Sequence, residues 1–372
     1  MLQPNIPHGY KATALGIIPQ EWEVKRLGEI CTYFKSGEGI TSKDISENGQ
    51  YPVYGGNGLR GYTDKKYTHD GAYILIGRQG ALCGNINYVT GKCYISEHAI
   101  AVQTKGDLSW LRYKLDFWNL NRYSESSAQP GLSVEKLVRY KLTVPPLAEQ
   151  RKIAEVLGVW DEAIEKQARL IEKLALRKRA LMQRLLSAKL RLPGFSEPWK
   201  KVKLGDVAEL YQPQTIQSED LSQTGYPVYG ANGLIGYYNS YNHEYPQVVI
   251  TCRGSSCGTV NFTPGKCWIT GNAMVLNVDN NRDVNKSFFY YLISNSSFVN
   301  LISGSGQPQI VRQPLLKFEL HIPTLKEQTA IAEVLTAADR EIELAKEKLE
   351  RLRRQKRGLM QQLLTGKKRV HL

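Results

Sequence analysis

The chain has 372 residues, 42% of them hydrophobic, and a formal net charge of +14 with an isoelectric point near 9.3. This length allows two or three domains with cores of their own, and the lack of any run of eighteen apolar residues argues against a membrane-spanning helix. The first residues lack the apolar stretch of a secretory signal, so we expect a cytoplasmic protein without a membrane partner. The positive charge favours a polyanionic partner, with nucleic acid as the leading candidate.

The first part of the chain, up to about residue 145, has the composition of a mostly β domain. It is rich in Tyr, Val, Ile, Thr and Gly, and short apolar runs such as residues 72–77 are separated by Gly and Asn turns. Residues 108–122 are the clearest helix within it. These patterns predict an α+β domain.

A long helix is predicted next, over residues 147–189, which contain no proline and a single glycine. Apolar residues recur there at steps of four and three, the heptad spacing of a coiled-coil seam. A helix of about 40 residues is about 60 Å long, which exceeds what a domain of this size needs. The predicted seam consists of Ile153, Leu157, Trp160, Ile164, Ile171, Leu174, Leu181 and Leu185.

The second half of the chain repeats the first. YPVYGGNGLRGY at residues 51–62 returns as YPVYGANGLIGY at 226–237, and residues 145–157 return at 322–335. Landmarks in the same order at nearly constant spacing indicate a duplication, and hence a pseudo-two-fold arrangement of two similar domains. The second helix carries its own seam of Ile331, Leu335, Ile342, Leu349, Leu352, Leu359 and Leu363.

The charges of the two helices suggest how they pair. Each begins with acidic residues and ends with basic ones, which suits the helix dipole and places opposite charges together if the helices are antiparallel. The apolar stripe has a second interpretation, in which each helix only packs on its own domain. Helix length and the heptad spacing favour the antiparallel pair. The predicted segments are domains at 1–145 and 193–323 and long helices at 146–192 and 324–372.

No catalytic signature is recognisable. Gly56, Gly58 and Gly61 spell G-x-G-x-x-G, but no helix is expected after them and the second copy has Ala231, so we interpret them as turn glycines. Phosphate-loop, amino-methyltransferase, zinc-protease and serine-hydrolase motifs are missing. The six cysteines lack metal-ligand spacing and are expected to be structural, and the histidines match at no place in the two halves.

Loops that differ between the two copies are the predicted recognition residues. Gln79 is matched with Gly254 and His98 with Asn272, whereas Arg78 and Arg253 are taken as common to both halves and as candidates for phosphate contact. Arg bonds guanine and Gln or Asn bonds adenine in the major groove, although any single residue here can also be a solvated loop residue. The candidates are Asn57, Arg60, Lys65, Lys66, Arg78, Gln79, His98, Gln129, Asn232, Arg253, Ser255, Ser256, Asn272, Gln307 and Gln309.

Taken in order, these motifs resemble a known family. The openings at 22–28 and 199–205, the YPVYG-x-NG segments, the Gln-Pro loops, the EQ-x-x-IA helix starts and the LMQ-x-LL ends resemble the specificity subunit of type I restriction-modification systems. The resemblance implies that the domains are target recognition domains reading a bipartite, asymmetric site in double-stranded DNA. It also implies that the helices form an antiparallel coiled coil that sets the spacing.

The resemblance further implies a chain without catalytic activity that scaffolds two methyltransferase subunits and restriction or translocase subunits. S-adenosylmethionine, ATP and Mg would then belong to those partners, with no cofactor or metal in this chain. Two other functions stay open at this stage. One is an enzyme with its own methyl-transfer or nuclease activity, and the other is a coiled-coil protein interaction scaffold that reads no DNA sequence.

Overall fold

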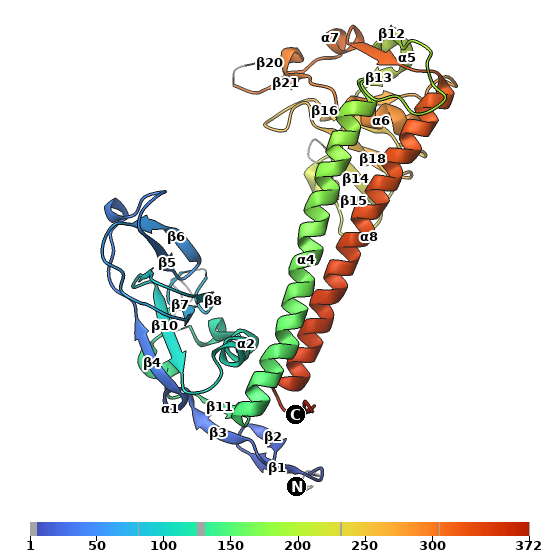
Figure 1. The fold of residues 1–372 in the computed structure, drawn as a ribbon. Coiled ribbons are helices and arrows are strands. Elements are labelled where there is room, and N and C mark those ends of the chain that lie inside the picture. Colours follow the sequence, from blue (N-terminus) through green and yellow to red (C-terminus); the bar gives the residue numbers. More distant parts are fainter. Residues whose placement is uncertain (1–5, 81, 125–130, 231–232, 305, 372) are drawn as a thin grey trace. The chain divides into compact units, whose positions relative to one another are not determined.

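A computed structural model describes residues 6–80, 82–124, 131–230, 233–304 and 306–371 (Figure 1). The chain divides into two compact units. Unit 1 comprises Met1–Gln167 with Lys348–Leu372, and unit 2 comprises Ala168–Glu347. The two long helices were predicted as separate segments, whereas each compact unit includes part of both helices.

Unit 1 contains two main sheets. A four-stranded antiparallel sheet has the order β4-β10-β7-β8, and a three-stranded sheet has the order β6-β5-β9 with β5 and β9 parallel. Two antiparallel strand pairs, β1-β2 and β3-β11, complete the unit. The strands are β1 (Tyr10–Thr13), β2 (Gly16–Pro19), β3 (Glu23–Arg26), β4 (Cys31–Ser36), β5 (Tyr51–Gly55), β6 (Gly58–Thr63), β7 (Tyr73–Gly77), β8 (Ile86–Val89), β9 (Tyr94–Ile95), β10 (Ala99–Thr104) and β11 (Lys141–Val144).

The helix packed on the sheet of unit 1 begins at a capping side chain. The Asp107 side chain accepts a hydrogen bond from Trp110 N at 2.7 Å and so caps α2 (Leu108–Trp118). The predicted helix is confirmed at its start but ends earlier, because Asn119 has a left-handed φ of 53° and a 3-10 turn follows. Two short helices, α1 (Leu27–Ile30) and α3 (Val134–Leu137), lie before β4 and before β11.

Unit 2 repeats the two main sheets, the strand pair before the long helix and the helix packed on the sheet. Its sheets have the orders β13-β19-β16-β17 and β15-β14-β18, with the pairs β12-β22 and β20-β21. Asn285 caps α6 as Asp107 caps α2. The elements are β12 (Lys200–Lys203), α5 (Leu204–Val207), β13 (Glu209–Tyr211), β14 (Tyr226–Gly230), β15 (Gly233–Tyr238), β16 (Val248–Thr251), β17 (Val260–Phe262), β18 (Trp268–Ile269), β19 (Ala273–Asn277), α6 (Lys286–Ser294), β20 (Ile302–Ser303), β21 (Gln309–Ile310), α7 (Arg312–Leu316) and β22 (Glu319–Ile322).

The two long helices are α4 (Leu147–Leu185) and α8 (Leu325–Leu363), coloured green and red in Figure 1. In unit 1, Glu149 near the start of α4 pairs with Arg369 just beyond α8, and Asp161 farther along α4 pairs with Lys356. Residue numbers thus rise along α4 as they fall along α8, and the helices are antiparallel, as predicted.

Unit 2 shows the same direction in its own helix segments. Lys178 pairs with Asp339, and Arg191, which follows α4, pairs with Glu327 at the start of α8. Each of these pairs is the counterpart of one in unit 1. No described helix is long and apolar enough to cross a membrane.

The apolar stripe of the helices serves both roles that the sequence left open. Ile153 and Leu157 of α4 are buried in the main core of unit 1, and Leu363 of α8 belongs to the same cluster. In unit 2, Leu174 packs against Ile342 and Ala345 across the helix pair. The stripe therefore packs each helix against a domain near the helix ends. Away from those ends it packs the two helices against each other.

Candidate nucleic-acid interface

In unit 1 the loops that differ between the copies meet at one edge of the sheets. Arg78 N, just after β7, donates to His98 O in the turn before β10 at 2.9 Å. Gly56, in the turn between β5 and β6, lies beside both, since a Cβ built there would be 2.8 Å from His98 O and 3.6 Å from Arg78 N. The turn that carries Asn57 is thus brought next to Arg78 and His98. This close approach explains Gly56, and β6 follows it in place of the helix that dinucleotide binding requires.

Unit 2 gathers its own differing loops in the same way. Cys252 N donates to Asn272 O at 3.1 Å, and Gly254 N donates to Pro308 O at 3.0 Å. Arg253 forms an antiparallel bridge with Gln309. Arg253, Asn272 and Gln309 therefore belong to one exposed cluster.

The structure corrects one pairing between the copies. The bond from Arg78 N to His98 O has its counterpart in the bond from Cys252 N to Asn272 O. Arg78 therefore corresponds to Cys252, and the predicted arginine common to both halves is wrong. An alignment by residue identity pairs Arg78 with Arg253. The equivalent backbone hydrogen bonds shift that alignment by one residue.

Gln79 is the true counterpart of Arg253. Gln79 forms an isolated antiparallel bridge with Gly131, as Arg253 does with Gln309. Both Gln79 and Arg253 are exposed, whereas Arg78 is half-buried and Cys252 is buried. The position at which the two units present different exposed polar side chains is thus Gln79 in one and Arg253 in the other.

Several other candidates are engaged within their own unit. The Lys65 ammonium lies 2.8 Å from the Asp44 carboxylate. His98 Nε2 lies 3.3 Å from the Glu97 carboxylate. The Arg60 side chain packs over Gly55, where a Cβ would meet its Cδ at 2.7 Å. These contacts restrict the three side chains, so they are weaker candidates for base contact.

The remaining candidates are distributed as follows. Asn57, Lys66, Ser255 and Gln307 are exposed, and Ser256 is half-buried. Gln129 and Asn232 lie outside the described residues.

Sequence reasoning missed one segment that joins the cluster of unit 2. Gln212 Nε2 donates to Gly271 O at 3.0 Å, and Trp268 Nε1 donates to Gln214 O at 3.3 Å. These bonds bring residues 212–215 beside the turn that carries Asn272. The only signal in the sequence was that this segment differs from its counterpart near residue 37.

The structure also corrects the statement that no histidines match. His69 bridges Cys93 in unit 1, and His243 bridges Cys267 in unit 2. The His69 ring bonds the Tyr33 hydroxyl at 3.2 Å, and His243 bonds that of Tyr211 at 2.9 Å. Burial lowers the pKa of both histidines. Sequence matching missed the pair because flanking residues differ, Thr68 in one copy and Asn242 in the other.

These histidines are internal supports of each domain. They are buried, and no group of three or more His, Cys, Asp or Glu side chains suited to a metal occurs in the described ranges. The described part of the chain contains six free cysteines, four of them buried. Cys83 Sγ contacts Arg78 O and Cys257 Sγ contacts Cys252 O, which are equivalent atoms. The duplicated thiols therefore pack below the recognition loops.

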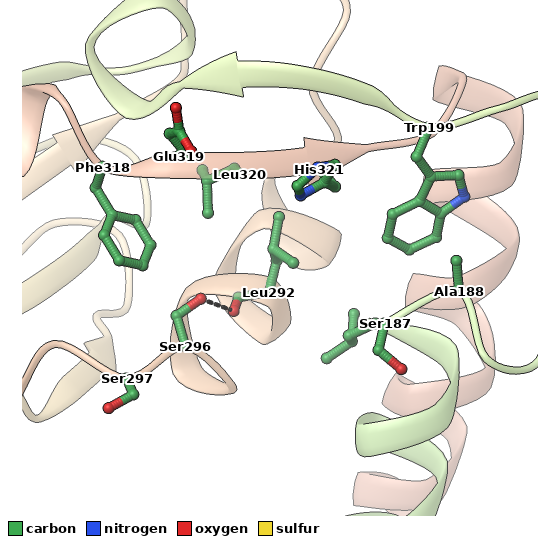
Figure 2. Close-up of a pocket in the computed structure, with 11 residues that line it drawn as sticks. Ser187, Ala188, Trp199, Leu292, Ser296, Ser297, Phe318, Glu319, Leu320 and His321 are labelled. Carbon is green, nitrogen blue, oxygen red and sulfur yellow. Dashed lines mark hydrogen bonds between the residues drawn. The ribbon is translucent and has the colours of Figure 1, made fainter.

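A groove in unit 2 lies beside the end of α4 (Figure 2). Its lining is mainly apolar and hydroxyl-bearing, and Ser296 Oγ donates to Leu292 O at 2.8 Å. The Glu319 carboxylate at its rim pairs with Lys201. In unit 1 the corresponding groove contains Lys114 where unit 2 has Leu292. Such a lining has no nucleophile and base within bonding reach, so it does not compete with the loops as a functional site.

The fold and these loops define a duplicated binding protein, with one scaffold used twice and different polar residues at its exposed edge. A family model described as the type I restriction modification DNA specificity domain matches residues 19–175 and again residues 196–354. The chain belongs to this family and is a specificity subunit of a type I restriction-modification system. Recognition of DNA sequence is the role that the family implies.

Individual relatives agree. The chain is 42% identical over 160 residues to the type I restriction enzyme EcoprrI specificity subunit of Escherichia coli, over 41% of this chain and 39% of that one. It is 24% identical to the MjaVIII specificity subunit of Methanocaldococcus jannaschii, over 95% and 94% of the two chains. A crystal structure of a type I S subunit from M. genitalium shares the fold, with a TM-score of 0.64, 18% identity and 98% of each chain covered.

Proposed function

We propose that the two units read the two parts of a bipartite, asymmetric DNA site and that α4 and α8 set the gap between those parts. The single observation that carries the proposal is the duplicated edge. Equivalent backbone positions present Gln79 in one unit and Arg253 in the other on one shared scaffold. Two copies of a reader with different side chains suit a target with two different parts.

The charge and the helices support the same proposal. A net charge of +14 favours binding to phosphates, because each neutralised phosphate releases condensed counterions. Each long helix runs without a break for 39 residues. A continuous helix is stiff, so its length is suited to fixing a distance along a duplex.

We further propose that the chain acts in the cytoplasm as a non-catalytic scaffold. Its partners would be two methyltransferase subunits and the restriction or translocase subunits. S-adenosylmethionine, ATP and Mg would be bound by those partners.

The test is to lengthen both helices together. Seven residues that continue the heptad are inserted after Gln167 in α4 and before Lys348 in α8, where the two units divide. Seven helical residues add about 10 Å, which is about three base pairs of duplex. With its methyltransferase partner, the lengthened protein should methylate the same two short motifs at a gap about three base pairs longer.

The matched control replaces seven residues at the same two places with a heptad of equal length, and its gap should not change. Altered motifs at an unchanged gap would contradict the proposal. So would uniform methylation or binding of all DNA by the unaltered protein.

The alternative of a protein interaction scaffold without sequence reading makes a different prediction. Its binding would not respond to salt, whereas neutralising several phosphates makes the affinity fall steeply as salt rises. Incorporation of labelled methyl groups by the purified chain alone would instead point to an enzyme.

A further inference from the structure

We propose that Gln79 and Arg253 are equivalent specificity-determining residues, each reading one base of its own half-site, with Gln79 selecting adenine and Arg253 selecting guanine. This inference rests on the proposed function and names residues for it. It starts from the backbone contacts that correct the alignment of the two copies.

Two backbone contacts around these residues are repeated in the two units. Leu132 N donates to Arg78 O at 2.9 Å, and Ile310 N donates to Cys252 O at 2.9 Å. The bridge that follows joins Gln79 to the residue before Leu132 and joins Arg253 to the residue before Ile310. The two side chains therefore project from equivalent positions of the same backbone hydrogen-bond pattern.

The surroundings leave room for a base edge. Gly80 and Gly254 follow the two residues with φ of +79° and +85°, and a Cβ built on either would meet nothing within 4 Å. Open space beside an exposed side chain allows a flat ligand to approach the backbone closely. The left-handed φ explains why both copies keep a glycine there.

Both side chains are available for contact. Gln79 and Arg253 are exposed, and neither side chain forms a hydrogen bond or ion pair with another described residue. This separates them from Lys65 and His98, which already pair with carboxylates. The backbone bridge fixes the Cα of each residue, so less conformational freedom is lost on binding than in a loose loop.

The chemistry of the two side chains assigns the bases. A glutamine amide both donates and accepts, which matches N6 and N7 of adenine, and an arginine fork donates twice, which matches O6 and N7 of guanine. One scaffold position would therefore read adenine in one half-site and guanine in the other. In unit 2, Asn272 is also exposed, and its carbonyl oxygen accepts from the backbone N–H of Cys252, the residue before Arg253.

The test exchanges the two residues in the complex with the methyltransferase partner. Gln79→Arg and Arg253→Gln are made singly, and the methylated or bound motif is determined from a random DNA library. We expect Gln79→Arg to change one position of one half-site from adenine to guanine, and Arg253→Gln to change one position of the other from guanine to adenine. Discrimination at that position should move by about 5- to 150-fold, the range for a bidentate pair.

The controls separate base reading from charge. Lys66→Ala removes an exposed positive charge beyond the end of β6 opposite the turn at Gly56, and should weaken binding about equally for all sequences without changing the motif. Arg253→Lys retains the charge without the fork and should reduce discrimination at the one position while the rest of the motif stays the same.

The possible failures are distinct. If the unaltered complex shows no bipartite motif, the proposed function and this inference both fall. If it shows a motif that Gln79→Arg and Arg253→Gln leave unchanged, only this inference is overturned. Loss of a whole half-site without a new preference at one position would also overturn it, because it would mean that the residues support the loop and do not read a base.

Discussion

The two units share most of the side-chain contacts that stabilise their fold and differ in a few of them. In both, a tyrosine hydroxyl from the helix packed on the sheet bonds an aspartate of a long helix, and a lysine of the other long helix pairs with that aspartate. The clusters are Tyr113, Asp161 and Lys356 in unit 1 and Tyr291, Asp339 and Lys178 in unit 2. Contacts that hold the framework are thus kept through the duplication, and the one between Lys356 and Asp161 brings together residues 195 positions apart in the chain.

The units differ where a buried group has lost or gained a partner. Glu149 accepts from Trp22 Nε1 at 2.9 Å as well as from Arg369, whereas Glu327 pairs with Arg191 and the Trp199 indole N–H finds no partner among the described residues. A second difference is Lys114, which is buried where unit 2 has a leucine. The same fold thus accommodates two different sets of buried polar contacts.

The largest expected effect tests the first difference. Arg191→Ala leaves the buried Glu327 carboxylate without a cation and should lower the free energy of unfolding by about 3–5 kcal/mol. Arg369→Ala should cost less, since Trp22 still donates to Glu149. Urea unfolding of the two variants measures this, with Arg191→Lys and Arg369→Lys as charge-retaining controls. Equal losses in both units would contradict the assigned role of Trp22.

The second prediction concerns the pH dependence that Lys114 imposes. Its Nζ donates to Thr143 Oγ1 at 2.9 Å and to Leu364 O at 2.6 Å, and burial lowers its pKa from 10.5 to about 8. Below pH 8 the lysine is charged in both folded and unfolded chains, and the full cost of burying that charge applies. Between pH 8 and 10.5 the folded protein releases the proton first, so the free energy of unfolding rises with pH.

Lys114→Leu copies the residue of unit 2 and removes this titration. The unfolding free energy of the natural protein minus that of the variant should rise by about 3 kcal/mol from pH 7 to pH 10.5. Comparison with the variant cancels the other groups that titrate in this range. A constant difference would show that Lys114 keeps an ordinary pKa.

A smaller effect tests the repeated cluster on the helices. Tyr113→Phe removes one hydrogen bond, to Asp161, and should cost about 1 kcal/mol, whereas Tyr291→Phe removes the bonds to both Asp339 and Thr336. The loss should be greater for Tyr291→Phe, because Asp161 also pairs with Arg112 at 3.3 Å. Thermal unfolding of the two variants gives the order, and the reverse order would contradict the roles assigned to Thr336 and Arg112.

The smallest expected effect comes from moving the chain ends. The N-terminal segment before Trp22 corresponds to the linker between α4 and Trp199, so a protein opened near Pro193 with its old ends joined should fold and bind DNA as before. Binding of the permuted and natural chains with the methyltransferase partner is compared directly. Collapse of the permuted chain would contradict the equivalence of the two units.

Much of this architecture could be predicted from local patterns. The heptad spacing and the absence of proline predicted α4 and α8, and the repeated landmarks predicted two units of one α+β fold. Charge at the two ends of each helix predicted the antiparallel pair. These are properties of neighbouring residues, and short-range geometry converts them directly into structure.

The contact partners of individual side chains could not be predicted from the sequence. An alignment by residue identity pairs Arg78 with Arg253, whereas the backbone hydrogen bonds make Arg253 equivalent to Gln79. The equivalence of His69 and His243 was missed because the residues next to them differ.

Repeats and periodicity depend on residues near each other in the chain, and they suffice to predict a duplicated protein with two long antiparallel helices. Tertiary packing, by contrast, sets which buried charge pairs with which partner, as when Glu149 pairs with Arg369. It also decided which loop residues share an equivalent position. Such contacts depend on how distant segments pack, and sequence spacing does not record that.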